Sequence, residues 1–552
     1  MGRLRSQARV RSRDLERTFR WCCVAAGLLQ FVVSARHSFT FDTVSYLDSA
    51  RAYLGHDWRV AVNTYFSTLY SWLLMPVVAM GRKNAAVELP AAHLLNLVLY
   101  LGALRGFGRM WRALRHSSAA TDGSGVLLGE AAWLVLGYGL FALFFVFQVN
   151  ALTPDLLVAL VMFAAAERLL RQNESEQPFK HYVALGALLA VGYYAKAVML
   201  VVGIAILGCT AVLTRPRSVR RLLETAAVSG FVFALLSAPL ILAISAVVGH
   251  PSWSETGRAN YLWWVTEYER TESIGEVNVP GIKPVLYRSP LVYASDIVPR
   301  VSYGPWYDPG RLDPRPAGFQ VRAQVRALAR TLSTYRYFFL TMEGGLCALI
   351  GGLLLVNFRA TLRGLVRHWF LLVPALVCFM IYGLVIVEAR YIAAAMVIFW
   401  GAVIGGIRIP EPSAKLANSV CVAAVVLMYA AGARFFLEPF SGLWGSGPDG
   451  ATETHLAEAL RKGGFGGSSV AVIGMGADCY WAHLADMHIV AEIPNAQPFT
   501  SAPAEVTADV LRALARKGAV LLVGSDANRL PTELQRRAKL VDNWYYISLG
   551  AP

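Results

Sequence analysis

Charged residues are scarce in this chain. Asp, Glu, Lys and Arg make up 16% of its 552 residues, whereas a soluble domain has about a quarter. Hydrophobic residues make up 56% and the mean hydropathy is +0.47, which excludes a string of soluble domains and predicts an integral membrane protein. Of the seven cysteines only Cys479 lies in a polar stretch, so no disulfide framework and no thiolate metal site is available there. The sequence also lacks the internal repeats that many transporters have.

Apolar runs recur along the chain at the length, about 20 residues, that a bilayer core requires. Eleven such runs lie near residues 21–36, 89–105, 126–148, 155–170, 181–195, 197–213, 224–248, 337–357, 369–387, 391–407 and 416–432. Arginines and lysines gather before the first run and in every second connection, so the positive-inside rule places the N-terminus in the cytoplasm and the C-terminus outside. The net charge of +15 is therefore explained by the basic residues that fix the membrane topology, and nucleic-acid binding is not expected. The first run could alternatively be a signal peptide cleaved near Val33-Ser34-Ala35.

The sequence divides into a basic cytoplasmic tail (1–20), a transmembrane part (21–436) with long outer loops (37–88 and 249–336), a linker (437–451) and a C-terminal region (452–552). Residues 68–80 are apolar but too short to span, and are predicted to form an interfacial helix. The C-terminal region alternates helix-like and strand-like segments, which predicts a small extracytoplasmic α/β domain. Its Gly474-Met475-Gly476 is interpreted as a tight turn, because Cys479 replaces the third glycine of a dinucleotide-binding loop. The predicted fold is a polytopic α-helical membrane protein with about eleven transmembrane helices, plus this soluble domain.

Asp42 is a candidate catalytic residue in the first outer loop. A carboxylate placed just beyond a span end, among aromatic side chains at the membrane surface, is partly desolvated and suited to act as a base. The alternative is that Asp42 caps the amphipathic helix predicted over residues 43–54. Asp48 and Arg51 are three residues apart on that helix, so they are predicted to form a surface ion pair.

Four strings stand at corresponding places near the ends of apolar runs: Asp42 through Asp57-Trp58 to Ser67-Thr68-Leu69-Tyr70-Ser71-Trp72-Leu73-Leu74, Thr153-Pro154-Asp155-Leu156-Leu157, Gly192-Tyr193-Tyr194-Ala195-Lys196 and Arg390-Tyr391. These strings resemble those of GT-C fold membrane glycosyltransferases of the dolichyl- or polyprenyl-phosphate-sugar mannosyltransferase and aminoarabinose-transferase type. In the large outer loop, the stretches 254–264 and 304–309 are similar to strings of uncharacterised bacterial members. The resemblance covers the span pattern from about residue 20 to residue 432.

The resemblance implies a role for individual residues. Asp42 is expected to be the catalytic base, and Asp155 to orient the acceptor or a catalytic side chain. The other expected roles are contacts to the donor phosphate for Lys196, Arg390 and Arg258, and positions in the substrate loops for Tyr46, Tyr70, Trp72 and Tyr391. The structural alternatives are snorkelling for Lys196, an ion pair with Glu388 for Arg390, a helix start for Asp155 and a solvated position for Arg258. Because Thr43 stands where the family often has Glu, a divalent metal ion would have few acidic ligands, and no obligatory metal or other cofactor is expected.

The resemblance therefore implies a glycosyltransferase that moves a hexosyl or pentosyl group, with inversion, from a polyprenyl-phosphate donor lipid to a hydroxyl or amine. The acceptor could be a lipid, a glycan or a protein. The expected location is a bacterial inner membrane with the outer face in the periplasm. Two alternatives remain open, a lipid or sugar transporter or flippase, and a non-catalytic membrane assembly subunit. The selected ionisable residues gather at span ends on one side of the membrane, which favours a catalyst over a transporter.

Overall fold

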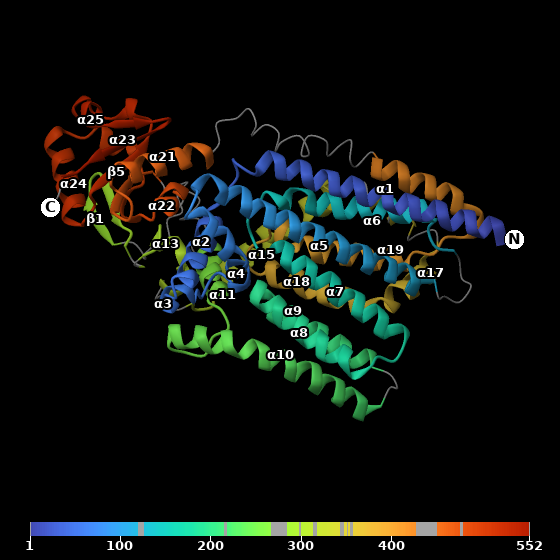
Figure 1. Ribbon diagram of the computed structural model, residues 1–552. Coiled ribbons are helices and arrows are strands. Elements are labelled where there is room, and N and C mark those ends of the chain that lie inside the picture. The colour runs from blue at the N-terminus through green and yellow to red at the C-terminus, as the bar shows by residue number, and fades with distance from the viewer. Residues whose placement is uncertain are drawn as a thin grey trace.

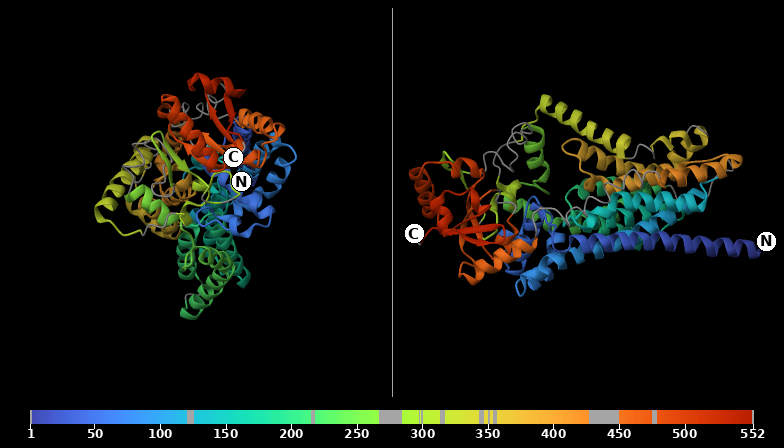
Figure 2. Two further views of the ribbon diagram at one scale, coloured as in Figure 1. Left: turned by 90° about the vertical axis from the view of Figure 1, so that its left-hand side faces the viewer. Right: turned by 90° about the horizontal axis from the view of Figure 1, so that it is seen from above.

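The chain forms an elongated bundle of helices with a smaller sheet-containing part at one end (Figure 1). This computed structural model describes residues 2–119, 126–214, 218–266, 284–296, 298, 300–312, 317–342, 347–349, 351–353, 357–426, 450–474 and 479–550. The N-terminus lies at the far end of the bundle from the C-terminal part, as Figure 1 and the right-hand view of Figure 2 show. A chain with an odd number of spans has its two termini on opposite sides of the membrane, which agrees with this arrangement. The number of spans and the orientation of the chain in the membrane stay predictions.

The bundle is built from helices of very different length. They are α1 (Gly2–Ser34), α5 (Ala85–Ala119), α6 (Glu130–Phe145), η1 (Val146–Val149), α7 (Asp155–Glu174), α8 (Phe179–Ala195), α9 (Val198–Leu213), α10 (Val219–Val248), α15 (Val321–Arg336), η3 (Tyr337–Met342), α17 (Phe358–Arg367), α18 (Trp369–Gly383), η4 (Glu411–Ser413) and α19 (Ala389–Gly406). Residues 414–426 are also mostly helical. Most of the eleven predicted spans coincide with one of these helices.

Three described helices are long and apolar enough to cross a membrane by themselves, namely α5, α10 and α19. The segments Cys347–Leu353 and Phe358–Arg367 meet at 112° and would raise this number to four if they formed one span. Four shorter apolar helices have 14 to 16 residues: α4 (Thr68–Gly81), α6, α9 and α18. A helix of 16 residues rises about 24 Å, which is less than a bilayer core of roughly 30 Å. The prediction of eleven spans therefore includes several helices that are shorter than the bilayer core is thick.

Aromatic rings fill the middle of the bundle. Phe107 stacks on Trp111 with ring centroids 5.6 Å apart and packs against Phe141 at 5.1 Å. Elsewhere two helices cross so closely that only glycine fits, because a Cβ on Gly364 of α17 would collide with the backbone of Gly406 in α19. Close crossings at small residues are typical of helices that pack in a membrane, where van der Waals contact drives association.

The two outer loops fold into short helices at the end of the bundle that faces the C-terminal part (Figure 1). The first loop forms α2 (Phe41–Leu54), α3 (Trp58–Ala61) and α4, and the second forms α11 (Thr256–Asn260), η2 (Tyr261–Thr266), α13 (Gly304–Tyr307) and α14 (Pro309–Leu312). The short helix predicted over residues 68–80 is thus present as α4. It packs against α2 and α5.

The C-terminal part is built around a seven-stranded sheet with the order β1-β2-β4-β3-β5-β7-β6. The C-terminal strands are β3 (Ser469–Ile473), β4 (His488–Ile493), β5 (Leu521–Ser525), β6 (Lys539–Val541) and β7 (Trp544–Ser548). Strand β3 pairs in parallel with β4 and β5, and the other pairs are antiparallel. The helices of this part are α21 (Gly450–Lys462), α22 (Tyr480–Leu484), α23 (Ala496–Thr500), α24 (Ala504–Arg516), η6 (Ala527–Arg529) and α25 (Thr532–Arg537).

Two strands of this sheet come from the second outer loop. They are β1 (Val285–Arg288) and β2 (Leu291–Ala294), and β2 pairs with β4 of the C-terminal part. The prediction from the sequence had confined the α/β region to residues 452–552, so the loop's contribution to the sheet is a correction. Of the proposed linker, residues 437–449 lie outside the described residues, as do Met475 and Gly476 of the predicted tight turn. Gly474 has a φ of +110°, a conformation that favours glycine.

Candidate active site

Asp42 lies in the first turn of α2, and Thr40 is the residue that caps this helix. The Thr40 hydroxyl accepts a hydrogen bond from the backbone N–H of Thr43 at 3.3 Å, and the Thr43 hydroxyl accepts one from the backbone N–H of Thr40 at 3.0 Å. This reciprocal arrangement is a capping box. The interpretation of Asp42 as the cap is therefore wrong, and its carboxylate is available for other contacts. Thr43, which departs from the Glu of the resembled family, has a structural use here.

Asp42 is held by residues that are distant in the sequence. One of its carboxylate oxygens lies 3.3 Å from a guanidinium nitrogen of Arg390, and the other accepts a hydrogen bond from the indole N–H of Trp306 at 3.3 Å. Arg390 also forms an ion pair with Glu388 at 2.7 Å. The ion pair expected as the structural alternative for Arg390 is thus present, and it coexists with the contact to Asp42.

Asp155 and Lys196 form a second ion pair. Asp155 begins α7 and its carboxylate lies 2.6 Å from the Lys196 ammonium group. The Thr153 hydroxyl donates a hydrogen bond to the other carboxylate oxygen at 2.8 Å. Lys196 lies in the break between α8 and α9, where the backbone becomes extended. Because an unpaired charge is costly away from water, the side chain of Asp155, which is only 5% exposed, requires this cation.

The ring of Tyr391 joins the two ion pairs. The Lys196 ammonium nitrogen lies 3.9 Å from the ring centroid and the Arg390 guanidinium carbon lies 4.9 Å from it. Both distances are within the range of cation–π attraction. Arg390 also donates a hydrogen bond to the Tyr391 hydroxyl at 3.2 Å. We call Asp42, Glu388, Arg390, Tyr391, Lys196 and Asp155 the outer cluster.

Tyr46 and Tyr65 border the outer cluster from the first outer loop. Tyr46 is one helical turn beyond Asp42, and its ring packs edge-on against Tyr70 at 5.1 Å. Burial, followed by the negative charges of Asp42 and Asp155, raises the pKa of Tyr46 well above its ordinary value. Burial and the charge of Asp42 likewise raise the pKa of Tyr65. Both phenols therefore stay protonated at neutral pH and are unsuited to act as bases.

The other residues predicted for the site surround it in different ways. Tyr70 is fully buried and donates a hydrogen bond to Asn96 at 2.8 Å, so it supports Tyr46 from behind. Trp72 is partly exposed and its ring lies 5.5 Å from that of Tyr194. Arg258 forms an ion pair with Glu255 at 2.5 Å and donates a hydrogen bond to the carbonyl of Gly310, which ties α11 to α14. Their contacts with a substrate stay predictions.

Asp48 does not form the predicted surface pair with Arg51. It is buried, it accepts hydrogen bonds from the N–H and hydroxyl of Ser302 at 2.8 and 2.9 Å, and it lies 2.6 Å from Nδ1 of His483. The other ring nitrogen of His483 lies 3.1 Å from Glu88 in α5. Arg51 pairs instead with Asp486 at 2.8 Å. We call Asp48, His483 and Glu88 the histidine clamp, because it connects α2 and α5 to α22 of the C-terminal part.

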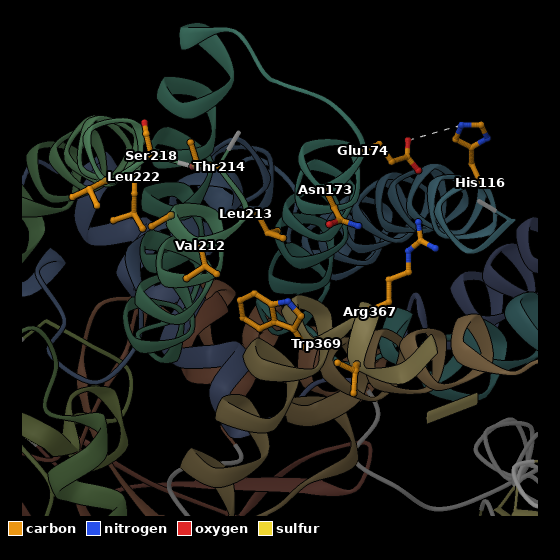
Figure 3. A pocket seen from close by; sticks show the side chains of 13 residues that line it. His116, Asn173, Glu174, Val212, Leu213, Thr214, Ser218, Leu222, Arg367 and Trp369 are labelled. Carbon is orange, nitrogen blue, oxygen red and sulfur yellow. Dashed lines mark ion pairs between the residues drawn. The ribbon is translucent and has the colours of Figure 1, made fainter. Parts of the chain in front are cut away.

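A large cavity lies at the other end of the bundle, away from the outer cluster. It has a volume of about 1020 Å³ and is lined by the ends of α7 and α9 and the beginnings of α10 and α18, as Figure 3 shows. His116 and Glu174 form an ion pair at its rim at 3.9 Å. The cavity contains none of the residues predicted for the site. The outer cluster is therefore defined by its side-chain contacts and not by the size of a cavity.

Within the part of the chain that the structure describes, no three His, Cys, Asp or Glu side chains are arranged to hold a metal ion. Asp42 and Asp155 each have a cation at ion-pair distance, Arg390 and Lys196 respectively. The expected independence of the protein from metal ions stays a prediction.

Two residues of the site were missed by the sequence reasoning. Trp306 lies in the noted string 304–309, but nothing in that string indicates that its indole reaches Asp42, 264 residues away. Glu388 was considered only as a structural partner of Arg390. The signal that the sequence offers is a Trp in a loop that is rich in aromatic residues and is predicted to lie on the same side of the membrane as Asp42.

No protein-family model matches the sequence, and no match to a curated protein was found. Two solved structures are similar to the chain. One is the oligosaccharyltransferase of Archaeoglobus fulgidus in complex with zinc and sulfate, which is 12% identical, with 91% of this chain and 67% of that chain covered and a TM-score of 0.49. The other is ArnT from Cupriavidus metallidurans in the apo state, which is 15% identical, with 96% and 97% covered and a TM-score of 0.41.

Proposed function

We propose that the protein transfers a sugar from a polyprenyl-phosphate donor to a hydroxyl or amine of an acceptor at the outer face of the membrane, with inversion at the anomeric carbon. The observation that carries this proposal is the outer cluster. Asp42 and Arg390 are 348 residues apart in the sequence and yet form an ion pair. The Tyr391 ring brings Lys196 to the same place. A base and two cations for a phosphate are thus available together.

The partial exposure of the charged side chains in the outer cluster supports the idea that a phosphate group can replace one of their ion-pair partners. The side chains of Asp42, Arg390 and Lys196 are 20%, 24% and 22% exposed. These charges are not sealed from solvent, so a phosphate group can reach Arg390 and take the place of the carboxylate as its anionic partner. Guanidinium is well suited to this exchange, since its planar donors match the oxygens of a phosphate. Donor binding to Arg390 would thereby release Asp42 from its ion pair.

The reaction follows from these positions. The released Asp42 carboxylate accepts the proton of the acceptor O–H or N–H while that atom forms a bond to the anomeric carbon. The bond from the anomeric carbon to the phosphate oxygen breaks, and its electron pair stays on the phosphate. Arg390 and Lys196 stabilise the negative charge that develops there. A single carboxylate base without a second nucleophile gives one displacement and therefore inversion.

Trp306 and Asp155 act in this proposal as positioning residues. The indole N–H of Trp306 holds one carboxylate oxygen of Asp42 and so fixes the direction of the other. Asp155 keeps Lys196 at the Tyr391 ring. Both contacts are made by residues of the chain itself and hold the charged groups in place, which is the pre-organisation that electrostatic catalysis requires.

The Asp42→Asn variant tests the proposal because it keeps the shape of the side chain and removes the base. We expect release of free polyprenyl phosphate from a labelled lipid-linked sugar to fall by about 10² to 10⁴-fold, the usual contribution of a general base. The matched control is Asp57→Asn, which lies in the same loop and pairs with exposed Arg300 at 3.5 Å. The control is expected to keep the wild-type rate. Wild-type turnover by Asp42→Asn would refute the assignment of the base.

The same assay separates the proposal from its alternatives. A transporter or a non-catalytic assembly subunit leaves the sugar–phosphate bond intact, so neither releases polyprenyl phosphate. The class of acceptor can be found by mass spectrometry of membrane lipids and surface glycans from cells with and without the protein. The expected result is the loss of one sugar modification in cells that lack it.

A further inference from the structure

A second charged pocket lies among the basic ends of α5, α7 and α8. It has a volume of about 420 Å³. Its lining residues are Arg109, Glu167, Arg168, Arg171, Gln177, Pro178, Lys180, His181 and Ala184. Arg168 is thirteen residues beyond Asp155 on α7, which at 1.5 Å per residue is roughly 20 Å along the helix. The pocket is therefore separate from the outer cluster, and the positive-inside rule assigns it to the cytoplasmic side.

The charges in this pocket are unbalanced. The lining includes three arginines and one lysine but only one carboxylate, that of Glu167. Glu167 is already shared by Arg171 at 2.6 Å and Arg109 at 3.1 Å. Among the residues that the structure describes, Arg168 and Lys180 have no carboxylate within ion-pair distance; a nitrogen of Arg168 reaches only the backbone carbonyl of Ala164, at 3.4 Å. Two cations of the pocket are thus left for an anion from outside the chain.

Two polar features of α8 also favour binding of an anion in this pocket. The pocket includes the first turn of α8, a helix of 17 residues whose N-terminal N–H groups carry a partial positive charge. The Nε2 atom of His181 is shielded from solvent and lacks a hydrogen-bond partner in the described part of the chain. A phosphate oxygen in the pocket would supply an acceptor for this atom in the tautomer that has the proton on Nε2.

The surroundings of the pocket favour a lipid as the source of the phosphate. Phe179 lies between the lining residues Pro178 and Lys180, and 68% of it is exposed. The ion pair of Arg221 with Glu176 at 3.1 Å ties the start of α10 to the segment before α8, and there Val219, which also lines the larger cavity, and Leu223 are 75% and 60% exposed. Apolar side chains beside a basic pocket at the end of a bundle provide contacts for acyl chains next to a headgroup site. A soluble phosphate would use only the charged part of this surface.

We propose that this pocket binds the phosphodiester headgroup of an anionic phospholipid of the cytoplasmic leaflet. Arg168 and Lys180 bind the phosphate directly. Arg109 and Arg171, which are paired with Glu167, add positive charge to the pocket. The acyl chains lie along the exposed apolar residues of α8 and α10. A lipid held here joins α5, α7 and α8 at the end of the bundle opposite the outer cluster.

Native mass spectrometry of the purified full-length protein tests this proposal, with dioleoyl phosphatidylglycerol and dioleoyl phosphatidylcholine as probes. We expect the wild type to retain phosphatidylglycerol in preference to phosphatidylcholine. The double variant Arg168→Gln/Lys180→Gln is expected to bind phosphatidylglycerol roughly tenfold more weakly, because both cations proposed to contact the phosphate are removed. The matched control is Arg359→Gln/Arg363→Gln, which removes the same charge from exposed positions of α17 and should keep wild-type affinity.

A variant with the opposite expected effect guards against loss of binding through misfolding. Glu167→Gln frees Arg109 and Arg171 from their carboxylate, so its affinity for phosphatidylglycerol should rise. Equal affinity of the wild type for both lipids would overturn the proposal, as would equal losses in the two double variants. Displacement of phosphatidylglycerol by millimolar inorganic phosphate would overturn the assignment to a lipid and leave a site for a soluble phosphate.

Discussion

The outer cluster and the histidine clamp both use a carboxylate of α2, but their environments differ. Asp42 in the outer cluster is 20% exposed and shares partly exposed cations. Six residues further on, Asp48 is 3% exposed and faces a histidine with no exposure. Solvent can reach the first set of charges and help them to change partners, whereas the second set is fixed by the cost of leaving a buried charge unpaired. One helix thus carries a partly exposed carboxylate, which we propose to be the base, at its start and a buried structural carboxylate in its middle.

The largest effect on stability is expected when the histidine clamp loses its central residue. The His483→Leu variant leaves the carboxylates of Asp48 and Glu88 buried without the group between them. Breaking a buried pair in this way lowers the free energy of unfolding by about 3–5 kcal/mol. The measurement is thermal unfolding together with limited proteolysis of the C-terminal part. Asp486→Asn is the control, because it removes an ion pair whose carboxylate is 65% exposed and should change the stability by less than about 1 kcal/mol.

The second effect concerns the outer cluster and should appear in the rate and not in the stability. The Arg390→Gln variant removes a cation proposed to stabilise the leaving phosphate. We expect single-turnover transfer to slow by about 10² to 10³-fold, as when a donor to a developing negative charge is removed. Arg300→Gln, which removes an arginine with a 76% exposed side chain near the same loop, should leave the rate unchanged. A large loss of stability with an unchanged transfer rate in Arg390→Gln would contradict this prediction, because it would mean that Arg390 has a structural role like that of His483.

A smaller effect is expected from pH, and it should be confined to the histidine clamp. Burial and the nearby Arg51 would lower the pKa of His483, but the carboxylates of Glu88 and Asp48 outweigh them and raise it above 6.5. Burial opposes ionisation of Asp48 as well, yet the hydrogen bond and charge of His483, with Arg51 and Ser302, lower its pKa below 3.8. A raised histidine pKa gives stability that is complete below 6.5 and is lost as the pH rises through the raised value. A lowered aspartate pKa gives stability that is complete above 3.8 and is lost as the pH falls through the lowered value.

The connection between the two parts should therefore be strongest between about pH 4 and pH 6.5 and weaken in alkaline solution. Protease sensitivity of the C-terminal part measured from pH 5 to pH 9 checks this. The His483→Gln variant should lose the alkaline change, because it has no titrating group at this position. An alkaline change of the same size in this variant would assign the effect to another group.

The smallest effect is expected at the start of α2. Thr40→Ala removes the hydroxyl that caps the helix and should lower the free energy of unfolding by about 1 kcal/mol. Because Asp42 lies in the same turn, the transfer rate should also fall, by less than in Arg390→Gln. Thr40→Ser keeps the capping oxygen and is expected to restore both properties. Unfolding measurements and the transfer assay on the three proteins test this.

The sequence predicted the members of the outer cluster better than those of the histidine clamp. Lys196 and Arg390 stand directly at the ends of apolar runs and Asp42 stands six residues beyond one, so hydropathy predicts their depth in the membrane, and the resembled motifs supply their expected roles. Asp48 was paired with Arg51 because residues three apart on a helix are neighbours. Its actual partner, His483, is 435 residues away, and local spacing contains no information about such a contact.

The same limit applies to the sheet. Strands β3, β4 and β5 are mostly apolar and buried, so the strand-like segments predicted in the C-terminal region are recognisable from their own residues. Strands β1 and β2 are four residues each and partly exposed. A short strand without a regular apolar pattern is not recognisable from its own residues, because its pairing with β4 depends on a segment far along the chain.

The pairing of β2 with β4 has a practical consequence for anyone who wishes to produce the C-terminal part as a separate fragment. A fragment that begins at Gly450 would lack β1 and β2, and the backbone groups of β4 that pair with Tyr293 and Ala294 would face water. An unprotected strand edge invites pairing with other molecules and hence aggregation. A soluble piece would need residues 285–294 grafted beside β4, or a charged residue placed along that border.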